Sequence, residues 1–292
     1  MDEAPAVARR RVRLALRAAR EAKGLTQTHV AEAMDWSLSK VIRIEAGEVS
    51  VSVSDLRALL PFLEVTDAEE VGGLFAAAKV SRRQRYTLDA QYREHLPRGL
   101  LQLMQFEREA STVRYFNAGL VPGLLQTPRY AAAIFDIYTA GLAEATIKVR
   151  IEARLERRRQ LFGQPVPPEL LVVLDESVLH REIGGPGVMA EQLRVLLTPV
   201  DGDRVRIRIL PFTAPAPISL IGPFCILDMG DDAEAILYCE GPRSDRIVRS
   251  AREISEHRDI FDRLWALAER EAESAALITT AAEVMAARSG RR

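Results

Sequence analysis

The chain has 292 residues, 48% of them hydrophobic and 28% charged, and its formal net charge is -1. These values predict a globular protein with room for two domains. No apolar run is long enough to span a bilayer, and the charged N-terminus does not fit a signal peptide, so we expect a cytoplasmic protein without a membrane partner. Cys225 and Cys239 lack a metal-ligand spacing and histidine companions, so they favour free core thiols over a disulfide framework or a zinc site.

A net charge near zero argues by itself against a nucleic-acid-binding protein, but the N-terminal segment is locally basic. Its seven basic residues stand against three acidic ones, so this segment is positive by four. The basic residues are Arg9, Arg10, Arg11, Arg13, Arg17, Arg20 and Lys23. They suit contacts with phosphates, and a solvated helix face is the alternative.

The first predicted helix covers residues 5–23, with an apolar face opposite the arginines. That face would consist of Val12, Leu14, Ala15, Ala18 and Ala19.

Residues 24–47 predict two short helices joined by a tight turn. Thr26 is a good N-cap for the first of them, and Ser37 for the second. Val41 and Ile44 repeat at the i, i+3 spacing of a buried stripe. The pattern is typical of a helix-turn-helix whose last helix reads DNA, and an ordinary helical hairpin is the alternative.

Several residues of this segment keep a characteristic order and spacing. They are Gly24-Leu25-Thr26-Gln27, Val30-Ala31, Ser37, Ser39, Val41, Arg43-Ile44-Glu45 and Gly47. With them the segment resembles the Xre, or lambda-repressor-like, helix-turn-helix family. The resemblance implies a buried ion pair between Arg20 and Glu45. It also implies that DNA faces Thr26, Gln27, Thr28, Ser37, Leu38, Ser39, Lys40 and Arg43.

The residue types on the last helix divide the expected contacts. Arg43 is the best candidate for reading sequence, because a guanidinium can bond the O6 and N7 of one guanine together. Leu38 offers apolar contact, for instance to a thymine methyl, and Ser39 suits a base or a phosphate. Lys40 is better suited to phosphates, which position a protein without specifying sequence. Asp35 and Ile42 depart from the family's usual turn glycine and small polar residue.

Two more helices complete a five-helix N-terminal unit, the number found in lambda-repressor-like domains. Ser54 predicts the N-cap of a helix over residues 55–63, and Asp67 precedes the next one. We expect a DNA-binding domain over residues 1–80, a connector over 81–100 and a larger domain over 101–292.

The sequence of the larger domain predicts a mixture of helices and strands. Helices are expected over residues 101–117, 129–138, 144–162, 188–197, 244–273 and 275–288, the third with its charges along an exposed face. Strands are expected over residues 170–174, 205–210, 224–229 and 235–239. This order favours an α+β fold with a small antiparallel or mixed sheet.

No group of residues in the larger domain predicts catalysis. The loop at residues 184–187 lacks the Lys-Ser/Thr of a phosphate-binding loop, and the histidines are scattered. Asp175 and Glu176 resemble a paired-carboxylate site, but a helix cap or a salt bridge with Arg181 is favoured. We therefore expect no catalytic residue, no metal, no cofactor and no enzyme.

A second set of landmarks covers much of the larger domain. It consists of Val121-Pro122-Gly123-Leu124-Leu125-Gln126-Thr127, Tyr130-Ala131, Arg158-Arg159-Gln160, Leu174-Asp175-Glu176, Gly184-Gly185, Gln192-Leu193 and Ile209-Leu210-Pro211. With these the chain resembles actinobacterial WhiJ-like, antitoxin-like regulators with an uncharacterised C-terminal domain. The resemblance implies transcriptional control, often with a small partner protein. Residues 121–127 favour a tight turn with its leucines in the core, and a partner or effector contact is the alternative.

The sequence as a whole predicts a regulator that binds a double-stranded DNA operator as a homodimer. The dimer contact is expected in the larger domain, through the helix over residues 244–273 or the final one, and this domain would also receive a small partner protein. A one-component sensor with a small-molecule effector is the first rival, which an apolar pocket with a few converging polar groups would favour. A DNA-tethered enzyme is the second, and it would need titratable groups clustered in a cleft.

Overall fold

The computed structural model describes residues 5–47, 49–83, 94–138, 143–198, 204–216, 221–229, 235–241 and 245–290. The chain divides into two compact units, residues 1–87 and residues 88–292. Much of the expected connector falls on residues 84–93 and lies outside the described residues. None of the described helices is long and apolar enough to cross a membrane.

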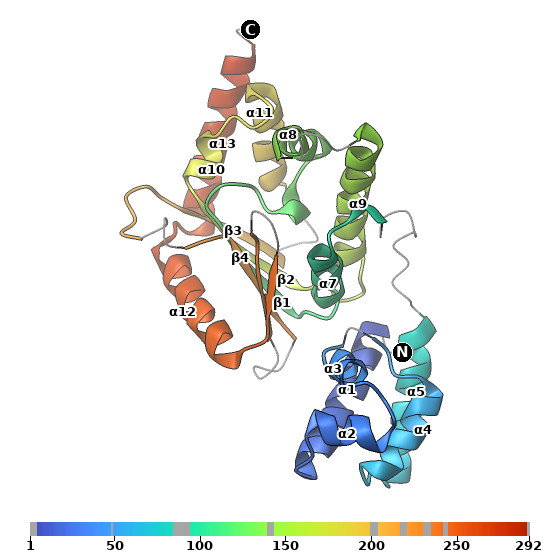
Figure 1. Ribbon diagram of the computed structural model, residues 1–292. Coiled ribbons are helices and arrows are strands. Elements are labelled where there is room, and N and C mark those ends of the chain that lie inside the picture. Colours follow the sequence, from blue (N-terminus) through green and yellow to red (C-terminus); the bar gives the residue numbers. More distant parts are fainter. Residues whose placement is uncertain are drawn as a thin grey trace. The chain divides into compact units, whose positions relative to one another are not determined.

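Five helices form the N-terminal unit, as the sequence predicted (Figure 1). They are α1 (Pro5–Ala22), α2 (Gln27–Ala33), α3 (Leu38–Glu45), α4 (Val53–Phe62) and α5 (Ala68–Arg83). Helix α1 packs against α5, and α2 packs against α3. The side chains between them form the core of this unit.

The buried face of α1 differs in part from the predicted one. Ala8, Val12 and Leu16 are buried, whereas Leu14 is half-buried and Ala18 is exposed. A spacing of four residues places the three buried side chains on one side of the helix. The prediction was wrong at Leu14 and Ala18 because composition alone did not show which side would meet α5.

Helix α4 begins two residues earlier than predicted. Ser52, not Ser54, is its N-cap, and the Ser52 Oγ accepts a hydrogen bond from the Asp55 amide at 2.9 Å. This start places Asp55 in the first turn, where a carboxylate is favoured by the helix dipole. Asp67 does precede α5 and accepts from the Glu70 amide at 2.8 Å.

The C-terminal unit combines helices with six strands, which confirms the α+β expectation (Figure 1). Its helical elements are α7 (Arg98–Glu107), the 3-10 helix η1 (Gly123–Leu125), α8 (Pro128–Tyr138), α9 (Glu144–Phe162), α10 (Ser177–His180), α11 (Pro186–Leu196), α12 (Ala251–Leu267) and α13 (Glu271–Ser289). Its strands are β1 (Thr112–Asn117), β2 (Glu169–Asp175), β3 (Val205–Leu210), β4 (Phe224–Asp228), β5 (Ala235–Cys239) and β6 (Arg246–Val248).

The six strands form one mixed sheet in the order β3-β2-β1-β4-β5-β6. Strands β1, β2 and β3 are parallel, whereas β4 pairs antiparallel with β1 and is followed by antiparallel β5 and β6. Parallel neighbours need long crossover connections, and here the chain makes them through helices. Both cysteines lie on the antiparallel strands as free thiols, as expected.

Helices cover both faces of the sheet, which explains the continuous apolar run of β2. Val172 and Cys225 belong to the face that packs against α7, α8, α11 and α13. Val173 and Ile226 belong to the opposite face, which packs against α12. Figure 1 shows α12 alone on its side of the described sheet.

The predicted helix over residues 101–117 is wrong in its second half. Helix α7 ends at Glu107, and residues 112–117 form β1, which lies between β2 and β4 in the middle of the sheet. Its sequence, TVRYFN, is rich in β-branched and aromatic residues, which pack well in a sheet. The apolar positions fitted a helical spacing as well, so periodicity alone did not separate the two structures.

The predicted helix over residues 244–273 is also wrong as a single element. Residues 246–248 form the edge strand β6, Ser250 caps α12, and the helix ends at Leu267. The break is held in place because the Glu269 amide donates to the Ile209 carbonyl at 2.9 Å. The Ser274 hydroxyl, which accepts from the Ile209 amide, fixes the start of α13.

A buried ion pair joins Arg157 of α9 to Glu107 of α7. It contradicts the expectation that the charges of α9 are exposed. The Arg157 guanidinium donates to both carboxylate oxygens of Glu107 and, at 3.0 Å, to the Tyr115 hydroxyl. Glu107 is 1% exposed and Arg157 is 7% exposed. Burial alone lowers the pKa of Arg157, but the charge of Glu107 more than offsets this and raises the pKa well above its ordinary value.

We expect Glu107→Ala to lower the free energy of unfolding of the C-terminal unit by about 3–5 kcal/mol, because Arg157 would remain buried without its counter-charge. Urea denaturation followed by Trp265 fluorescence measures this. A Trp36→Phe background leaves Trp265 as the single tryptophan, since the chain has two.

The double variant Glu107→Leu/Arg157→Met is the control for this prediction. Both variants are compared in a Tyr115→Phe background, because the Tyr115 hydroxyl would otherwise lose both of its partners. In that background the double variant removes both charges and keeps the volume, so it should recover most of the stability that Glu107→Ala loses. A double variant no more stable than Glu107→Ala would show that the loss does not come from an unpaired guanidinium.

Candidate nucleic-acid interface

The turn between α1 and α2 is closed by a reciprocal cap. The Thr26 hydroxyl accepts from the His29 amide at 3.2 Å, and the Thr26 amide donates to His29 Nδ1 at 3.2 Å. This is a capping box in which histidine takes the place of the usual Glu or Gln. Thr26 and Thr28 are exposed, as the expected DNA contacts require.

The turn between α2 and α3 depends on one residue with positive φ. Asp35 has φ +53°, and Asp is among the residues that tolerate this conformation without the freedom of glycine. Asp35 therefore supplies the positive φ that this turn requires. The turn ends at Ser37, whose hydroxyl accepts from the Lys40 amide at 3.2 Å and caps α3.

Helix α3 has a buried side and an exposed side. Val41 and Ile44 are buried in the core of the unit. The exposed side carries Leu38, Ser39, Ile42 and Arg43, and the two apolar residues are each 43% exposed. We call these four residues the reading face. Exposed apolar side chains one helical turn apart are suited to contact thymine methyl groups.

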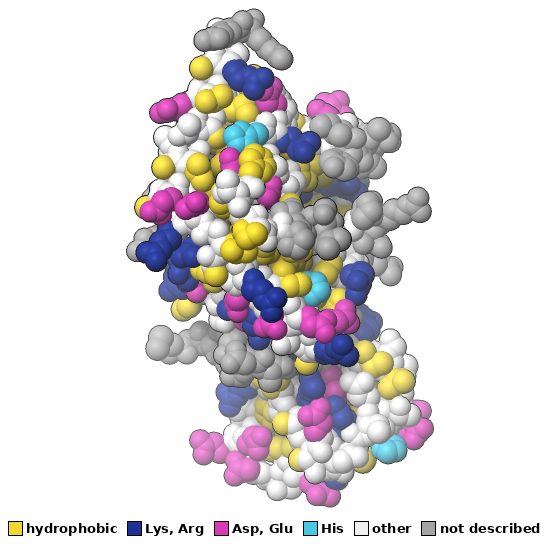
Figure 2. Space-filling model, turned by 90° about the vertical axis from the view of Figure 1, so that its left-hand side faces the viewer, with side chains coloured by type: hydrophobic (Ala, Val, Ile, Leu, Met, Phe, Trp, Pro, Cys, Tyr) yellow, Lys and Arg dark blue, Asp and Glu magenta, His cyan; other side chains and the backbone are white. Residues whose placement is uncertain are grey.

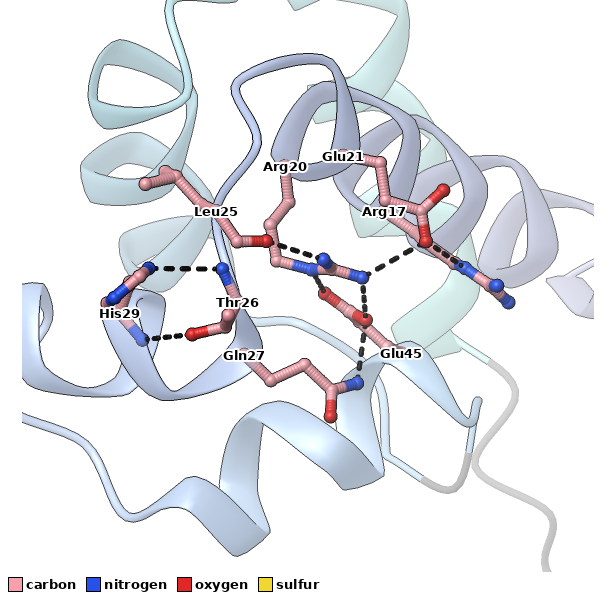
Figure 3. A network of polar contacts seen from close by, with 8 residues as sticks. All are labelled: Arg17, Arg20, Glu21, Leu25, Thr26, Gln27, His29 and Glu45. Atoms are coloured by element: carbon pink, nitrogen blue, oxygen red, sulfur yellow. Dashed lines mark hydrogen bonds and ion pairs between the residues drawn. The ribbon is translucent and has the colours of Figure 1, made fainter.

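The expected pair of Arg20 and Glu45 joins α1 to the last residue of α3 (Figure 3). The Arg20 Nε and Nη2 donate to the two oxygens of Glu45 at 2.7 and 3.0 Å, and Nη1 donates to the Leu25 carbonyl at 2.8 Å. The hydrogen bond with Glu45 raises the pKa of Arg20 although burial opposes it. This one side chain therefore joins α1, the turn before α2, and the end of α3.

Glu45 also fixes an expected DNA contact. The Gln27 Nε2 donates to Glu45 Oε2 at 2.8 Å, as Figure 3 shows. One amide hydrogen and the carbonyl oxygen of Gln27 remain for other partners. The amide orientation is therefore set by a buried ion pair, a link that the sequence did not reveal.

Lys40 is engaged within the protein. Its Nζ lies 3.2 Å from Asp55 Oδ1 and 3.6 Å from the centre of the Trp36 ring. The Lys40 side chain keeps a third of its surface exposed. A phosphate contact would therefore compete with an acidic group and an aromatic ring, and neither partner was predicted from the sequence.

The basic N-terminal segment is less available than its composition suggested. Arg13 and Arg20 are 7% and 9% exposed, so they do not lie on the surface as phosphate contacts would require. Arg11 and Arg17 are exposed, although the Arg17 Nε also donates to Glu21 at 2.9 Å. Only part of the local positive charge is therefore presented to a nucleic acid.

The segment Val121-Pro122-Gly123-Leu124-Leu125-Gln126-Thr127 is a buried turn around η1. Leu124 and Leu125 are at most 2% exposed, which confirms the prediction that they lie in the core. The Gln192 side chain of α11 accepts from the Thr127 amide at 2.7 Å and donates to the Leu125 carbonyl at 2.9 Å. Thr127 caps α8 by accepting from the Tyr130 amide at 3.2 Å. A protein partner thus has little access to the leucines.

The other residues considered for chemistry have structural contacts. The Asp175 carboxylate accepts from the Ser177 amide at 3.0 Å, and Glu176 accepts from the Phe212 amide at 2.8 Å. Glu176 also lies 3.3 Å from His180, rather than pairing with the expected Arg181. Within the described residues, no three His, Cys, Asp or Glu side chains group together as metal ligands would.

Comparisons with known proteins agree with this two-part organisation. The profile of a family described as a helix-turn-helix domain matches residues 12–71. The profile of a family described as a domain of unknown function, DUF5753, matches residues 100–280. No curated protein and no solved structure matches the chain.

We expect Glu45→Ala to lower the free energy of unfolding of the N-terminal unit by about 2–3 kcal/mol, because it removes charge-assisted hydrogen bonds to a largely buried guanidinium. Urea denaturation followed by Trp36 fluorescence in a Trp265→Phe background measures this.

Glu21→Ala is the matched control, because Glu21 also contacts Arg20 but its side chain is 52% exposed. It should change stability by less than about 0.5 kcal/mol. Equal effects of the two substitutions would contradict a special role for Glu45.

Proposed function

Because this chain belongs to the DUF5753 family and carries a helix-turn-helix domain before that region, we propose that it is a transcriptional regulator that binds a double-stranded DNA operator. The observation that carries the proposal is the reading face of α3. It is exposed, while the opposite side of the same helix is fixed in the core by Val41 and Ile44. A rigid helix of this kind suits insertion into the major groove.

The side chains of the reading face support sequence-specific recognition. Arg43 is exposed and can bond two atoms of one guanine. Leu38 and Ile42 would contact thymine methyl groups beside it. Gln27, oriented by Glu45, would reach a base or phosphate from the start of α2, and Thr26, Thr28, Ser37 and Ser39 supply hydroxyl groups. This division matches the Xre-like pattern of the sequence.

We extend the proposal to a homodimer, because one short reading helix covers few base pairs and two-fold proteins match paired half-sites. A groove of about 550 Å³ on the C-terminal unit supports this extension. Leu179 of α10 and Leu277 and Val284 of α13 line it, and Val284 is 50% exposed. Figure 2 shows hydrophobic side chains gathered on the face of the C-terminal unit that carries these helices. Of the two predicted dimer helices, α13 is therefore favoured over α12.

Binding of a small partner protein, as in WhiJ-like and antitoxin-like actinobacterial regulators, is a further part of the proposal. Its support is the resemblance of the C-terminal landmarks. Because most of residues 121–127 are buried, such a partner would bind another surface. The groove along α13 is the apolar surface best suited to it.

A second candidate function, a one-component sensor, is favoured by a specific observation. The C-terminal unit contains an apolar cavity lined by Leu96, Leu100, Met104 and Phe135, into which arginines of α9 converge. An apolar pocket with few polar groups is the usual form of a small-molecule site.

We expect Arg43→Ala to weaken binding to the cognate operator by about 1–3 kcal/mol and to relax preference at one base position, with little effect on random duplexes. Fluorescence anisotropy with both kinds of duplex measures this. Equal loss on both would exclude base reading by Arg43.

We expect Lys40→Ala to weaken binding to all duplexes alike and to lower the salt slope by about one unit, as for the loss of one phosphate contact. Lys79→Ala is the control, because Lys79 is an exposed cation on α5. An unchanged slope in Lys40→Ala would mean that Lys40 serves only Asp55 and Trp36.

We expect Val284→Arg to convert a full-length dimer into a monomer, because it places a charge in an apolar contact while its exposed site tolerates the change in the monomer. Sedimentation velocity measures the mass. Val166→Arg is the matched control, since Val166 is 72% exposed and outside the groove. A monomeric parent protein, or a dimeric Val284→Arg variant, would overturn the assignment.

A further inference from the structure

The apolar cavity of the C-terminal unit has a size that suits a single ring. Its volume is about 130 Å³, and its apolar lining comes from Leu96, Pro97 and the helices α7, α8 and α9. Engineered cavities of about 150 Å³ bind benzene. Met104 and Ala153 are each 2% exposed, so these walls belong to the folded core.

Three arginines of α9 enter the lining of this cavity, and no carboxylate does so among the described residues. Arg150, Arg154 and Arg157 lie at successive turns, which places them on one side of the helix. Arg157 is neutralised by Glu107, and the Arg150 Nε donates to the His95 carbonyl at 2.8 Å. Arg150 and Arg154 therefore have no ion pair within the described chain, and of these two only Arg154 also lines the polar cavity that adjoins this one.

The contacts of Arg154 within the described chain are with neutral groups. Its Nη1 donates to the Gln126 side chain, and its guanidinium lies 5.1 Å from the centre of the Phe135 ring. Burial, reinforced by the nearby charge of Arg157, lowers the pKa of Arg154 to about 10, so the group stays charged at neutral pH. Arg154 is half-buried. A partly desolvated cation without an ion pair is costly, and an anionic ligand would offset that cost.

A second cavity of about 220 Å³ adjoins the first, since both are lined by Pro97, Leu100, Arg154 and Arg157. Its lining is more polar and includes Gln126, Glu240 and Asp245. No ion pair joins either acid to Arg154 among the described residues, although the charge of Glu240 partly offsets the effect of burial on the pKa of Arg154. The Arg154 guanidinium lines both the apolar cavity and the polar one.

We propose that this pair of cavities is a binding site for a small organic anion whose apolar body, about one ring in size, fills the first cavity while its acidic group pairs with Arg154. Gln126 would then orient the guanidinium, which gives one residue of the 121–127 segment a role in effector binding. Binding of the anion does not depend on DNA recognition. An effect of the bound anion on operator affinity rests on the proposed sensor function.

Calorimetric titration of the full-length protein without DNA tests the site with three probes of one shape. They are benzoate, neutral benzamide and cationic benzylamine. We expect benzoate to bind one site at least about tenfold more tightly than benzamide, because a charge-assisted pair replaces a neutral hydrogen bond. Equal binding of benzoate and benzamide, no binding of benzoate, or tightest binding of benzylamine would each overturn the proposal.

Two variants locate the probe. Arg154→Met should remove the preference for benzoate, whereas Arg159→Met should keep it, because the Arg159 side chain is 74% exposed on the same helix. Ala153→Leu should weaken benzoate and benzamide alike by filling the apolar cavity. Melting temperatures without ligand verify that each variant is folded. A preference retained in Arg154→Met would refute the assigned anchor.

Operator affinity measured with and without benzoate is a separate experiment. It tests the sensor function, whereas the titration tests the site. Binding without an effect on DNA would leave the site standing and exclude the sensor function for this probe.

Discussion

A guanidinium removed from water must keep a counter-charge, and both units of this protein depend on that constraint. In the N-terminal unit Arg20 is held by two oxygens of Glu45, and in the C-terminal unit Arg157 is held by two oxygens of Glu107. Each pair joins elements that are distant in sequence. The pairs add specificity to cores that apolar side chains stabilise, because they are satisfied in one arrangement of the helices.

The constraint explains how so short a reading helix is oriented. Helix α3 has eight residues, too few to be stable alone in water. Its position comes from Val41 and Ile44 in the core and from Glu45, which ties its last turn to α1. The same carboxylate orients Gln27. The orientation of the surface that DNA would contact is therefore determined by buried residues. The exposed residues determine only the chemistry of that surface.

Local signals in the sequence predicted the parts of this structure that local chemistry determines. Caps at Thr26 and Ser37, the five helices and the mixed character of the larger domain follow from side chains near one another in the chain. Strand β1 was missed because its neighbours β2 and β4 are distant in sequence, and tertiary pairing decided between helix and strand. The inward position of Arg157 on α9 was missed because its partner, Glu107, lies fifty residues away.

Arg154 makes no ion pair inside the described protein, and the charge of Glu240 acts on it without a direct contact. Its neutral partners, Gln126 and the Phe135 ring, reduce the cost of burying its charge without cancelling it. Conflicts of this kind persist where function requires them, since a packed apolar residue of similar volume would be at least as stable there. The same physical rule that fixes the reading helix thus distinguishes structural arginines, which have their carboxylates, from the one that would receive its anion from a ligand.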